Sequence, residues 1–285
     1  KIWYLPEIRM CFTPPARDEC LHIKPLSATQ NGYTTFGCYQ TLSKINDQVL
    51  EAWGKILGAL PQTRLRIQNK QLGCIDTKKQ IKTRLTQFGV QEDRVTLLGP
   101  DTRKNYLASY AEIDILLDTF PYPGGTTTCE ALWMGVPTLT LAGETLLARQ
   151  GASILTAAGL SNWVADNVGD YVNKAVKLSA DLPYLVTLRS GLREQVRNSP
   201  LFDAKQFAKN LELAFLGMYD SKKLGFEDKR SAEVEVEKIF LHVGCGPRDK
   251  THTTAGFNNE SWREIRLDID EAVKPDIVGS MTDMA

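Results

Sequence analysis

The chain has 285 residues, of which 42% are hydrophobic and 24% are charged, proportions typical of a folded globular protein. Its 34 basic and 34 acidic residues give a net charge of zero, which argues against nucleic acid or an anionic membrane as a partner. The sequence contains no apolar run long enough to span a bilayer, and no signal pattern opens it.

Taken in chain order, the first 32 or so residues are rich in proline and predict irregular structure. Short apolar strands and amphipathic helices then alternate. The predicted strands are 34–39, 65–68, 95–98, 113–117 and 138–141. The predicted helices are 47–60, 77–88, 102–110, about 126–134, 145–158, 168–178, 182–197 and 203–219. This order predicts an α/β fold with a Rossmann-like parallel sheet and helices on both faces.

The pattern changes after residue 220. Residues 221–236 are charged and poor in apolar side chains, so we interpret them as a linker with room for a short helix. Residues 237–285 begin a partial second Rossmann-like unit, with strands predicted over 238–243, 266–270 and 274–278. The chain starts without methionine and stops just after a predicted strand, and we expect it to be a fragment of a longer polypeptide.

The most informative segment is 116–137, in which a buried strand leads through a Gly/Thr-rich loop into a helix. A helix start presents unpaired N–H groups and the positive end of the helix dipole. Gly124 and Gly125 allow a ligand to approach the backbone, and three threonines that follow add hydroxyl groups. The segment predicts a phosphate or pyrophosphate site. The alternative is an ordinary strand–loop–helix joint with a threonine cap.

Several segments, in this order, resemble the carboxyl-terminal catalytic lobe of SPINDLY-type protein O-GlcNAc transferases, which belong to glycosyltransferase family 41. They are residues 35–45, 118–137 and 141–145, followed by Arg149, 151–153 and 199–203. The resemblance covers about residues 1–220 and implies one Rossmann-like lobe of a GT-B fold that binds a UDP-sugar. It also implies that the family's first catalytic lobe and tetratricopeptide repeats, neither of which is found here, complete the enzyme and its binding of a protein or peptide acceptor.

The implied reaction is the inverting transfer of GlcNAc from UDP-GlcNAc to protein Ser or Thr hydroxyls, without a metal or cofactor. Lys44 matches the family lysine that contacts the phosphates, where its ammonium group neutralises charge on the leaving group. Thr126 and Thr127 match the threonines that bind the pyrophosphate, and Gly124 and Gly125 precede them. The alternative for Lys44 is a solvated side chain.

The resemblance also assigns residues to the nucleoside. Glu130 matches an acid that hydrogen-bonds the uridine ribose, and Tyr106 falls where an aromatic or histidine side chain packs near the uracil. Arg103 takes a basic position on the same loop–helix joint. Gln40 and Thr41 fall at a strand end that faces the nucleotide. The alternatives are a helix-start acid for Glu130 and a core residue for Tyr106.

The sequence offers no general base for the acceptor hydroxyl, because no histidine occurs between His22 and His242. The family's candidates for that role lie in the first lobe. We therefore expect this chain to bind UDP weakly and to transfer little or no sugar alone.

The six cysteines are scattered without a Cys-x-x-Cys pair, which predicts reduced thiols, a cytoplasmic location and no zinc site. Cys129 is interpreted as a buried structural thiol.

Residues 241–247 resemble the first motif of class I S-adenosylmethionine methyltransferases. Gly244 and Gly246 would lie against that cofactor, and Asp268 suits the acid that binds an adenosine ribose. Three alternatives to the glycosyltransferase interpretation stay open. They are a non-catalytic nucleotide-binding module, methylation as the main activity of the full protein, and a sugar-nucleotide epimerase. The sequence does not fix the sugar, the acceptor protein or the oligomeric state.

Overall fold

The computed structural model describes residues 3–15, 22–227, 239–243, 263–268 and 277–278. The chain divides into two compact units, Lys1–Asp220 and Ser221–Ala285. The first unit is built on a six-stranded sheet and the second on a three-stranded sheet. The two units are described in turn.

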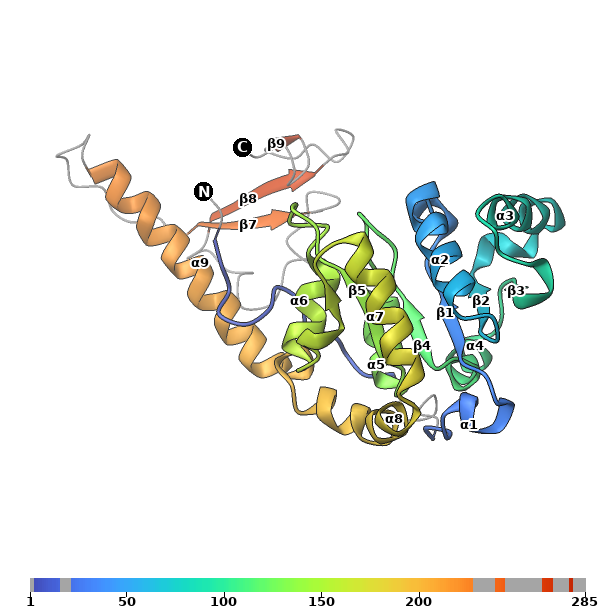
Figure 1. The fold of residues 1–285 in the computed structure, drawn as a ribbon. Helices are drawn as coiled ribbons and strands as arrows, with labels where there is room; N and C mark the ends of the chain where they lie inside the picture. The colour runs from blue at the N-terminus through green and yellow to red at the C-terminus, as the bar shows by residue number, and fades with distance from the viewer. Residues whose placement is uncertain (1–2, 16–21, 228–238, 244–262, 269–276, 279–285) are drawn as a thin grey trace. The chain divides into compact units, whose positions relative to one another are not determined.

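The sheet of the first unit is entirely parallel, with the strand order β3-β2-β1-β4-β5-β6 (Figure 1). The order reverses between β1 and β4, so their carboxyl ends flank the crevice in which such sheets bind ligands. The strands are β1 (Thr35–Cys38), β2 (Arg64–Gln68), β3 (Val95–Leu98), β4 (Ile115–Leu117), β5 (Thr138–Leu141) and β6 (Val164–Ala165). The strand β6 was not predicted, because two residues are too few to show a periodic pattern.

Helices cover both faces of this sheet, as the alternating pattern predicts. One face carries α2 (Asp47–Ala59), α3 (Ile75–Gln87) and α7 (Val168–Ala180). The other carries α4 (Arg103–Ser109), α5 (Thr126–Trp133) and α6 (Gln150–Ala157), with α8 (Leu182–Arg197) packed on α5. Six short 3-10 helices lie between the described elements, at Leu42–Lys44, Lys70–Gly73, Glu92–Arg94, Tyr110–Glu112, Ser161–Trp163 and Pro200–Phe202.

The core is continuous from these helices to the centre of the sheet. All three residues of β4 are buried, as its unbroken apolar run predicts. Trp53 of α2 and Tyr171 of α7 are also fully buried. The Tyr171 hydroxyl donates to the backbone oxygen of Asp118, at 2.9 Å. The packing of α7 is thereby connected to the residue that follows β4.

Two predicted helices differ from the observed ones. The predicted helix 145–158 begins only at Gln150, because the residues before it fold into turns: the Ala148 amide donates to the Thr145 hydroxyl at 3.1 Å, and the Gly143 amide to the Ala148 oxygen at 3.2 Å. The helix α9 (Ala204–Glu227), which begins in the first unit, continues past the predicted end at residue 219 and into the predicted linker.

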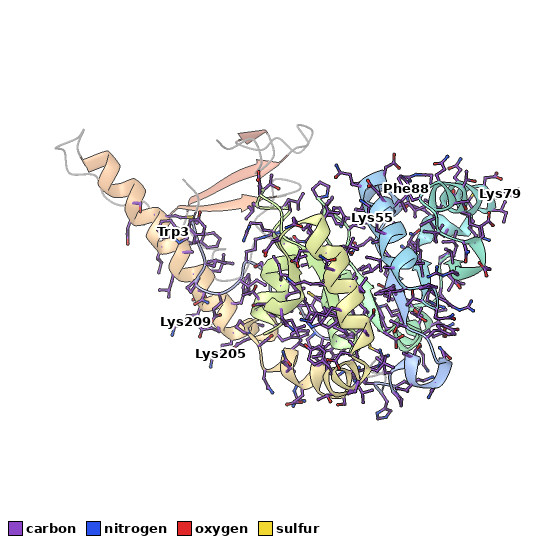
Figure 2. All side chains as sticks on the ribbon, in the orientation of Figure 1. Trp3, Lys55, Lys79, Phe88, Lys205 and Lys209 are labelled. Carbon is purple, nitrogen blue, oxygen red and sulfur yellow. The ribbon has the colours of Figure 1, made fainter. Side chains whose placement is uncertain are left out.

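The proline-rich start contains one short helix, α1 (Ser27–Asn31), and is otherwise anchored by side chains. The Trp3 ring covers Gly217 of α9, where a Cβ atom would come within 2.6 Å of it (Figure 2). The Phe12 amide donates to the Leu201 oxygen at 2.9 Å, and the Phe12 ring packs edge-on against Phe202. The irregular segment is therefore part of the packed lobe.

The second unit contains β7 (Ile239–Val243), β8 (Arg263–Asp268) and β9 (Ile277–Val278), which form a parallel sheet in that order. Asp268 is the last residue of β8. Gly244 and Gly246 lie outside the described residues. None of the helices in the described ranges is long and apolar enough to cross a membrane.

Candidate functional site

The predicted site lies at the switch point of the first sheet. After β1 the chain passes through Gln40 and Thr41 into the 3-10 helix that ends at Lys44. After β4 it passes through Asp118 and the Gly/Thr-rich loop into α5. Because the carboxyl ends of adjacent parallel strands meet at one edge, these two connections lie side by side.

The first turn of α5 has free backbone donors. Gly125 is the residue before the helix and supplies no side-chain cap. The first amide to bond within the helix is that of Cys129, which donates to the Gly125 oxygen at 3.0 Å. The amides of Thr126, Thr127 and Thr128 precede it, so they are available to an anion at the positive end of the helix dipole.

Gly124 is held at a position where only glycine fits. Its amide donates to the Asp118 carboxylate at 2.7 Å. A Cβ atom at Gly124 would overlap the amide nitrogen of Gln40 and come within 2.5 Å of the Thr128 hydroxyl and 2.8 Å of the Thr127 hydroxyl. The absence of a side chain therefore lets the β4–α5 loop close against the residue that follows β1.

Gln40 joins the two connections. Its side-chain nitrogen donates to the Thr127 hydroxyl at 2.7 Å, and its side-chain oxygen lies 3.5 Å from the ammonium nitrogen of Lys44. Lys44 also donates to the Pro123 oxygen at 3.0 Å, and its nitrogen lies 3.8 Å from the centre of the Tyr122 ring. These contacts hold the half-buried ammonium group beside the α5 amino terminus.

A second group of predicted residues forms around Glu130. The Glu130 carboxylate is almost fully buried; it accepts from the Tyr106 hydroxyl at 2.8 Å and pairs with Arg103 at 2.6 Å. Because Tyr106 donates its proton to Glu130, the single proton of the Tyr110 hydroxyl is shared between the Tyr106 oxygen at 2.9 Å and the Thr127 backbone oxygen at 3.3 Å. Burial and then the nearby Glu130 charge raise the pKa of Tyr106, so its hydroxyl stays a donor. The structure thus connects the two groups of residues.

An open pocket of about 760 Å³ adjoins this second group. Tyr39, Arg103 and Tyr106 form an aromatic and basic wall. The other walls combine amide, hydroxyl and charged side chains with a Gly-Pro turn, and their residues are Thr41, Gln68, Asn69, Lys70, Gln71, Gly99, Pro100 and Asp101. Such a surface combines a ring-stacking wall with hydrogen-bonding groups at its edge.

The structure therefore brings nearly all the predicted residues of the first unit to one edge. Gln40, Lys44, Gly124 and Thr127 share one network. Arg103, Tyr106 and Glu130 share the other. Thr41 lines the pocket, with its hydroxyl hydrogen-bonded to that of Ser43, and Thr126 is exposed on the first turn of α5. A Cβ atom on Gly125 would come within 2.7 Å of Gln150.

Sequence reasoning missed Asp118, Thr140 and Tyr110. Asp118 is fully buried, and its second carboxylate oxygen accepts from Thr140 of β5 at 2.8 Å. An acid directly after an apolar strand was the available signal for Asp118. Thr140 and Tyr110 had no signal, because their roles depend on contacts between distant segments.

The remaining candidates do not form a site. Cys129 is buried, and burial raises the pKa of its thiol to about 12, which leaves it protonated and unreactive. Among the described residues, no cluster of three or more His, Cys, Asp or Glu side chains could hold a metal ion. The four cysteines described, Cys11, Cys38, Cys74 and Cys129, are free thiols.

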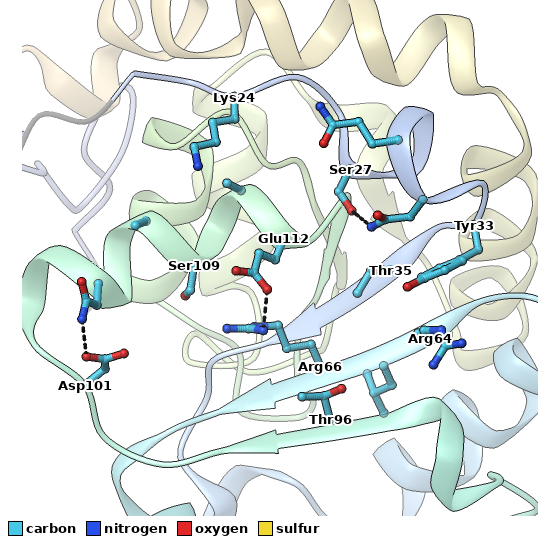
Figure 3. Close-up of a pocket in the computed structure, with 16 residues that line it drawn as sticks. Lys24, Ser27, Tyr33, Thr35, Arg64, Arg66, Thr96, Asp101, Ser109 and Glu112 are labelled. Atoms are coloured by element: carbon cyan, nitrogen blue, oxygen red, sulfur yellow. Dashed lines mark hydrogen bonds and ion pairs between the residues drawn. The ribbon is translucent and has the colours of Figure 1, made fainter.

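A separate cavity of about 600 Å³ lies between α1, α4 and the strands β1 to β3 (Figure 3). Arg66 projects into it from β2 and pairs with Glu112 at 2.9 Å. Thr35 and Thr96 come from the neighbouring strands. None of the predicted site residues lines this cavity. The switch point, rather than this cavity, is the candidate site.

The strand order, with the site residues gathered at the carboxyl ends of β1 and β4, defines an open parallel α/β lobe. The model of the Glycosyl transferase family 41 matches residues 29–211. The chain therefore belongs to glycosyltransferase family 41. The expected α/β fold is confirmed, and the sheet with its helices matches one lobe of a GT-B glycosyltransferase.

Similar proteins agree with this assignment. The chain is 40% identical over 216 residues to the "Probable UDP-N-acetylglucosamine--peptide N-acetylglucosaminyltransferase SPINDLY" of Petunia hybrida, and 39% identical to the protein of that name from Arabidopsis thaliana. Each match covers 75% of this chain and 23% of the relative. A solved mutant of the Thermobaculum terrenum O-GlcNAc transferase matches with a TM-score of 0.67 and 39% identity. That match covers 72% of this chain and 38% of the other. The chain thus spans about a quarter of its curated relatives.

Proposed function

We propose that residues 1–220 form the UDP-sugar-binding lobe of a protein O-glycosyltransferase. The observation that supports this most directly is the convergence of Lys44, Gln40 and Thr127 at the amino terminus of α5, beside a pocket with an aromatic wall. A nucleoside diphosphate has an anionic part and a ring, and this edge offers a complementary surface to each.

In this proposal the diphosphate binds at the start of α5. The free amides, the hydroxyls of Thr126 and Thr127, and the Lys44 ammonium group would neutralise charge that develops as UDP leaves. Positive charge supplied by the chain supports a reaction without a metal or cofactor. Gly124 does not present open backbone to the phosphates as the sequence predicted, because the Gln40 amide fills that space; its lack of a side chain instead lets Gln40 reach Thr127.

The nucleoside would occupy the neighbouring pocket. Tyr106 and Tyr39 offer aromatic surface for the uracil, and Thr41 and Asn69 offer polar groups at the rim. Glu130 is already bonded to Tyr106 and Arg103, so it would meet the ribose from a position that these two partners fix. An exchange of one partner for the ribose hydroxyl would couple nucleoside binding to the position of Arg103.

Calorimetric titration of the chain with UDP tests the proposal. Lys44→Ala and Thr127→Val should each weaken binding at least about tenfold, because each removes a charged or hydroxyl contact to the diphosphate. Lys55→Ala is the matched control, since Lys55 pairs with Glu51 on the exposed surface of α2 (Figure 2). Absence of UDP binding in folded wild type would overturn the proposal. Equal losses in the control would show that the effect is not specific to the site.

For the whole protein, we propose inverting transfer of GlcNAc to Ser or Thr hydroxyls of a protein or peptide in the cytoplasm. The names of the similar proteins support the donor and the acceptor class. Free thiols among the described cysteines are compatible with a reducing compartment. Sugar transfer should require the polypeptide that supplies the general base, so this chain alone should bind UDP without turnover.

We further propose that 221–236 connects this lobe to 237–285, and that 237–285 belongs to an S-adenosylmethionine-binding fold. The support is the parallel sheet β7-β8-β9, in which Asp268 ends the middle strand. Acids in that position of Rossmann-like folds bind ribose hydroxyls. Binding of S-adenosylmethionine by a longer chain, lost in Asp268→Ala, would support this assignment, and no binding would overturn it.

A further inference from the structure

A buried carboxylate lies directly behind the proposed diphosphate site. Asp118 is fully buried at the end of β4. Its Oδ1 accepts from the amides of Gly124 at 2.7 Å and Thr119 at 3.0 Å, and from the Gln40 side-chain nitrogen at 3.3 Å. Its Oδ2 accepts from Thr140 at 2.8 Å. An ionised carboxylate only accepts hydrogen bonds, so all four neighbours must direct protons toward it.

This requirement fixes the direction of the Gln40 amide. With its nitrogen toward Asp118, the Gln40 oxygen faces the ammonium group of Lys44. The reversed amide would place its oxygen against the Asp118 carboxylate and its NH₂ group against Lys44. Both contacts would be repulsive, because the first would pair two hydrogen-bond acceptors and the second would pair two donors. Asp118 and Lys44 therefore select the same orientation from opposite ends.

The orientation of Gln40 determines what Thr127 can donate. The Gln40 nitrogen donates to the Thr127 hydroxyl oxygen at 2.7 Å. The proton of that hydroxyl is thus left for a different acceptor. An oxygen of a diphosphate bound at the start of α5 is an acceptor of suitable charge and position.

Asp118 also acts on the charge of Lys44. Burial lowers the pKa of Lys44, and the Asp118 charge opposes that effect. The other titratable groups facing Asp118 are the Cys38 thiol of β1 and the Tyr171 hydroxyl of α7. Burial raises the pKa of both, to about 12 for Cys38, so both are neutral near pH 7. Among these groups, Lys44 is the one that carries a positive charge.

We propose that Asp118 is a positioning residue of the donor site, which orients Gln40 and thereby leaves the Thr127 proton and the Lys44 charge available to a bound diphosphate. This role rests on the proposed function of the lobe. Burial raises the pKa of Asp118 to about 6. Below that pH the carboxyl group gains a proton, becomes a donor as well as an acceptor, and no longer fixes the Gln40 amide.

The Lys44 side chain reports this role without any ligand. Its pKa is measured by NMR on the side-chain Cε and Nζ nuclei, with assignment from Lys44→Arg. Asp118→Asn keeps the shape of the side chain and removes the charge, and it should lower the Lys44 pKa below its wild-type value. Asp114→Asn is the matched control: Asp114 is also fully buried, immediately before β4, but it accepts from the amides of Thr35 and Ala28. It should leave the Lys44 pKa unchanged.

The wild-type titration provides a second measurement that needs no variant to fold. The Lys44 signals should show an additional inflection near pH 6, where Asp118 ionises. UDP titration at pH 7.5 forms a separate arm, in which Asp118→Asn should weaken binding about tenfold relative to Asp114→Asn. An unchanged Lys44 pKa in folded Asp118→Asn, or a wild-type titration without the inflection, overturns the positioning role. Failure of wild type to bind UDP, with the Lys44 shift present, overturns the proposed function instead.

Discussion

At the scale of single residues, the site depends on the close approach of Gly124 to Gln40. The two residues follow different strands, and their contact leaves no room for a Cβ atom. The Gly/Thr-rich motif predicted that the backbone would be open at this point. It did not predict that the opening would be filled by an amide of the same chain, because Gln40 lies 87 residues before the Thr127 that it bonds.

Gly124→Ala tests this packing. The added methyl group must displace Gln40 or the loop, so UDP affinity should fall by about tenfold or more, and stability should fall by about 1–3 kcal/mol. Calorimetric titration and urea unfolding measure the two effects. Gly58→Ala in α2 is the control, because a Cβ there meets nothing within 4 Å. It should preserve UDP binding and gain up to about 1 kcal/mol from helix propensity. Wild-type affinity in Gly124→Ala would contradict the close-packed loop.

At the scale of secondary-structure elements, the strands were the most predictable part of the fold. Apolar runs such as 113–117 predicted fully buried parallel strands, and β4 is one. Element ends were less predictable, since they depend on tertiary contacts: the turn before α6 closes through the Gly143–Ala148 bond. The residues of the candidate site divide in the same way, into those that a local motif predicts and those that depend on tertiary contacts. Motif residues such as Lys44 and Thr127 could be predicted, whereas Asp118 and Tyr110 act through long-range bonds that no local pattern encodes.

The attachment of α8 shows how one side chain secures an element. Arg189 is 2% exposed and donates to the backbone oxygens of Lys24, Ile113 and Tyr110 at 2.8 to 3.1 Å. It thus joins α8 to the segments before β1 and β4. Arg189→Met should cost about 3–5 kcal/mol, since three buried acceptors lose their donor and the buried Asp114 loses a nearby positive charge.

Urea unfolding of Arg189→Met is compared with that of Arg197→Met on the same helix. Arg197 pairs with Glu194 at the surface, where its side chain is 58% exposed, so its loss should cost no more than about 1 kcal/mol. Similar costs for the two variants would show that the Arg189 bonds do not secure α8.

At the scale of the whole molecule, buried acids shape the response to pH. Burial raises the pKa values of Asp114 and Asp118 above 3.8, so between that pH and the native pKa the folded chain binds more protons than the unfolded chain. Their contribution to stability is therefore greatest below about pH 4 and is lost as the pH rises through the native pKa of each acid, which is about 6 for Asp118. Surface acids with lowered pKa values, such as Asp170 and Glu194, contribute in the opposite direction.

The Asp118 contribution can be isolated by difference. The free energy of unfolding of wild type, minus that of Asp118→Asn, should fall as the pH rises from 4 to 6, by roughly 1.4 kcal/mol per pH unit, and should level off above pH 7. Urea unfolding at intervals of half a pH unit measures it. The subtraction cancels the surface acids, which both chains share. A difference that rises with pH would show that Asp118 is stabilised, rather than destabilised, in its charged form.

The central pairing of β1 with β4 also determines when the site can exist during folding. Lys44 and Pro123, which bond across the site, lie 79 residues apart in sequence. The strands β1 to β3 can pair through segments that are nearer in sequence, but the site cannot form until the chain crosses back over β1 and adds β4 to the sheet. UDP can therefore recognise only molecules in which β4 has paired with β1. Its binding should lengthen the lifetime of the native lobe against unfolding, while the early folding rate stays the same.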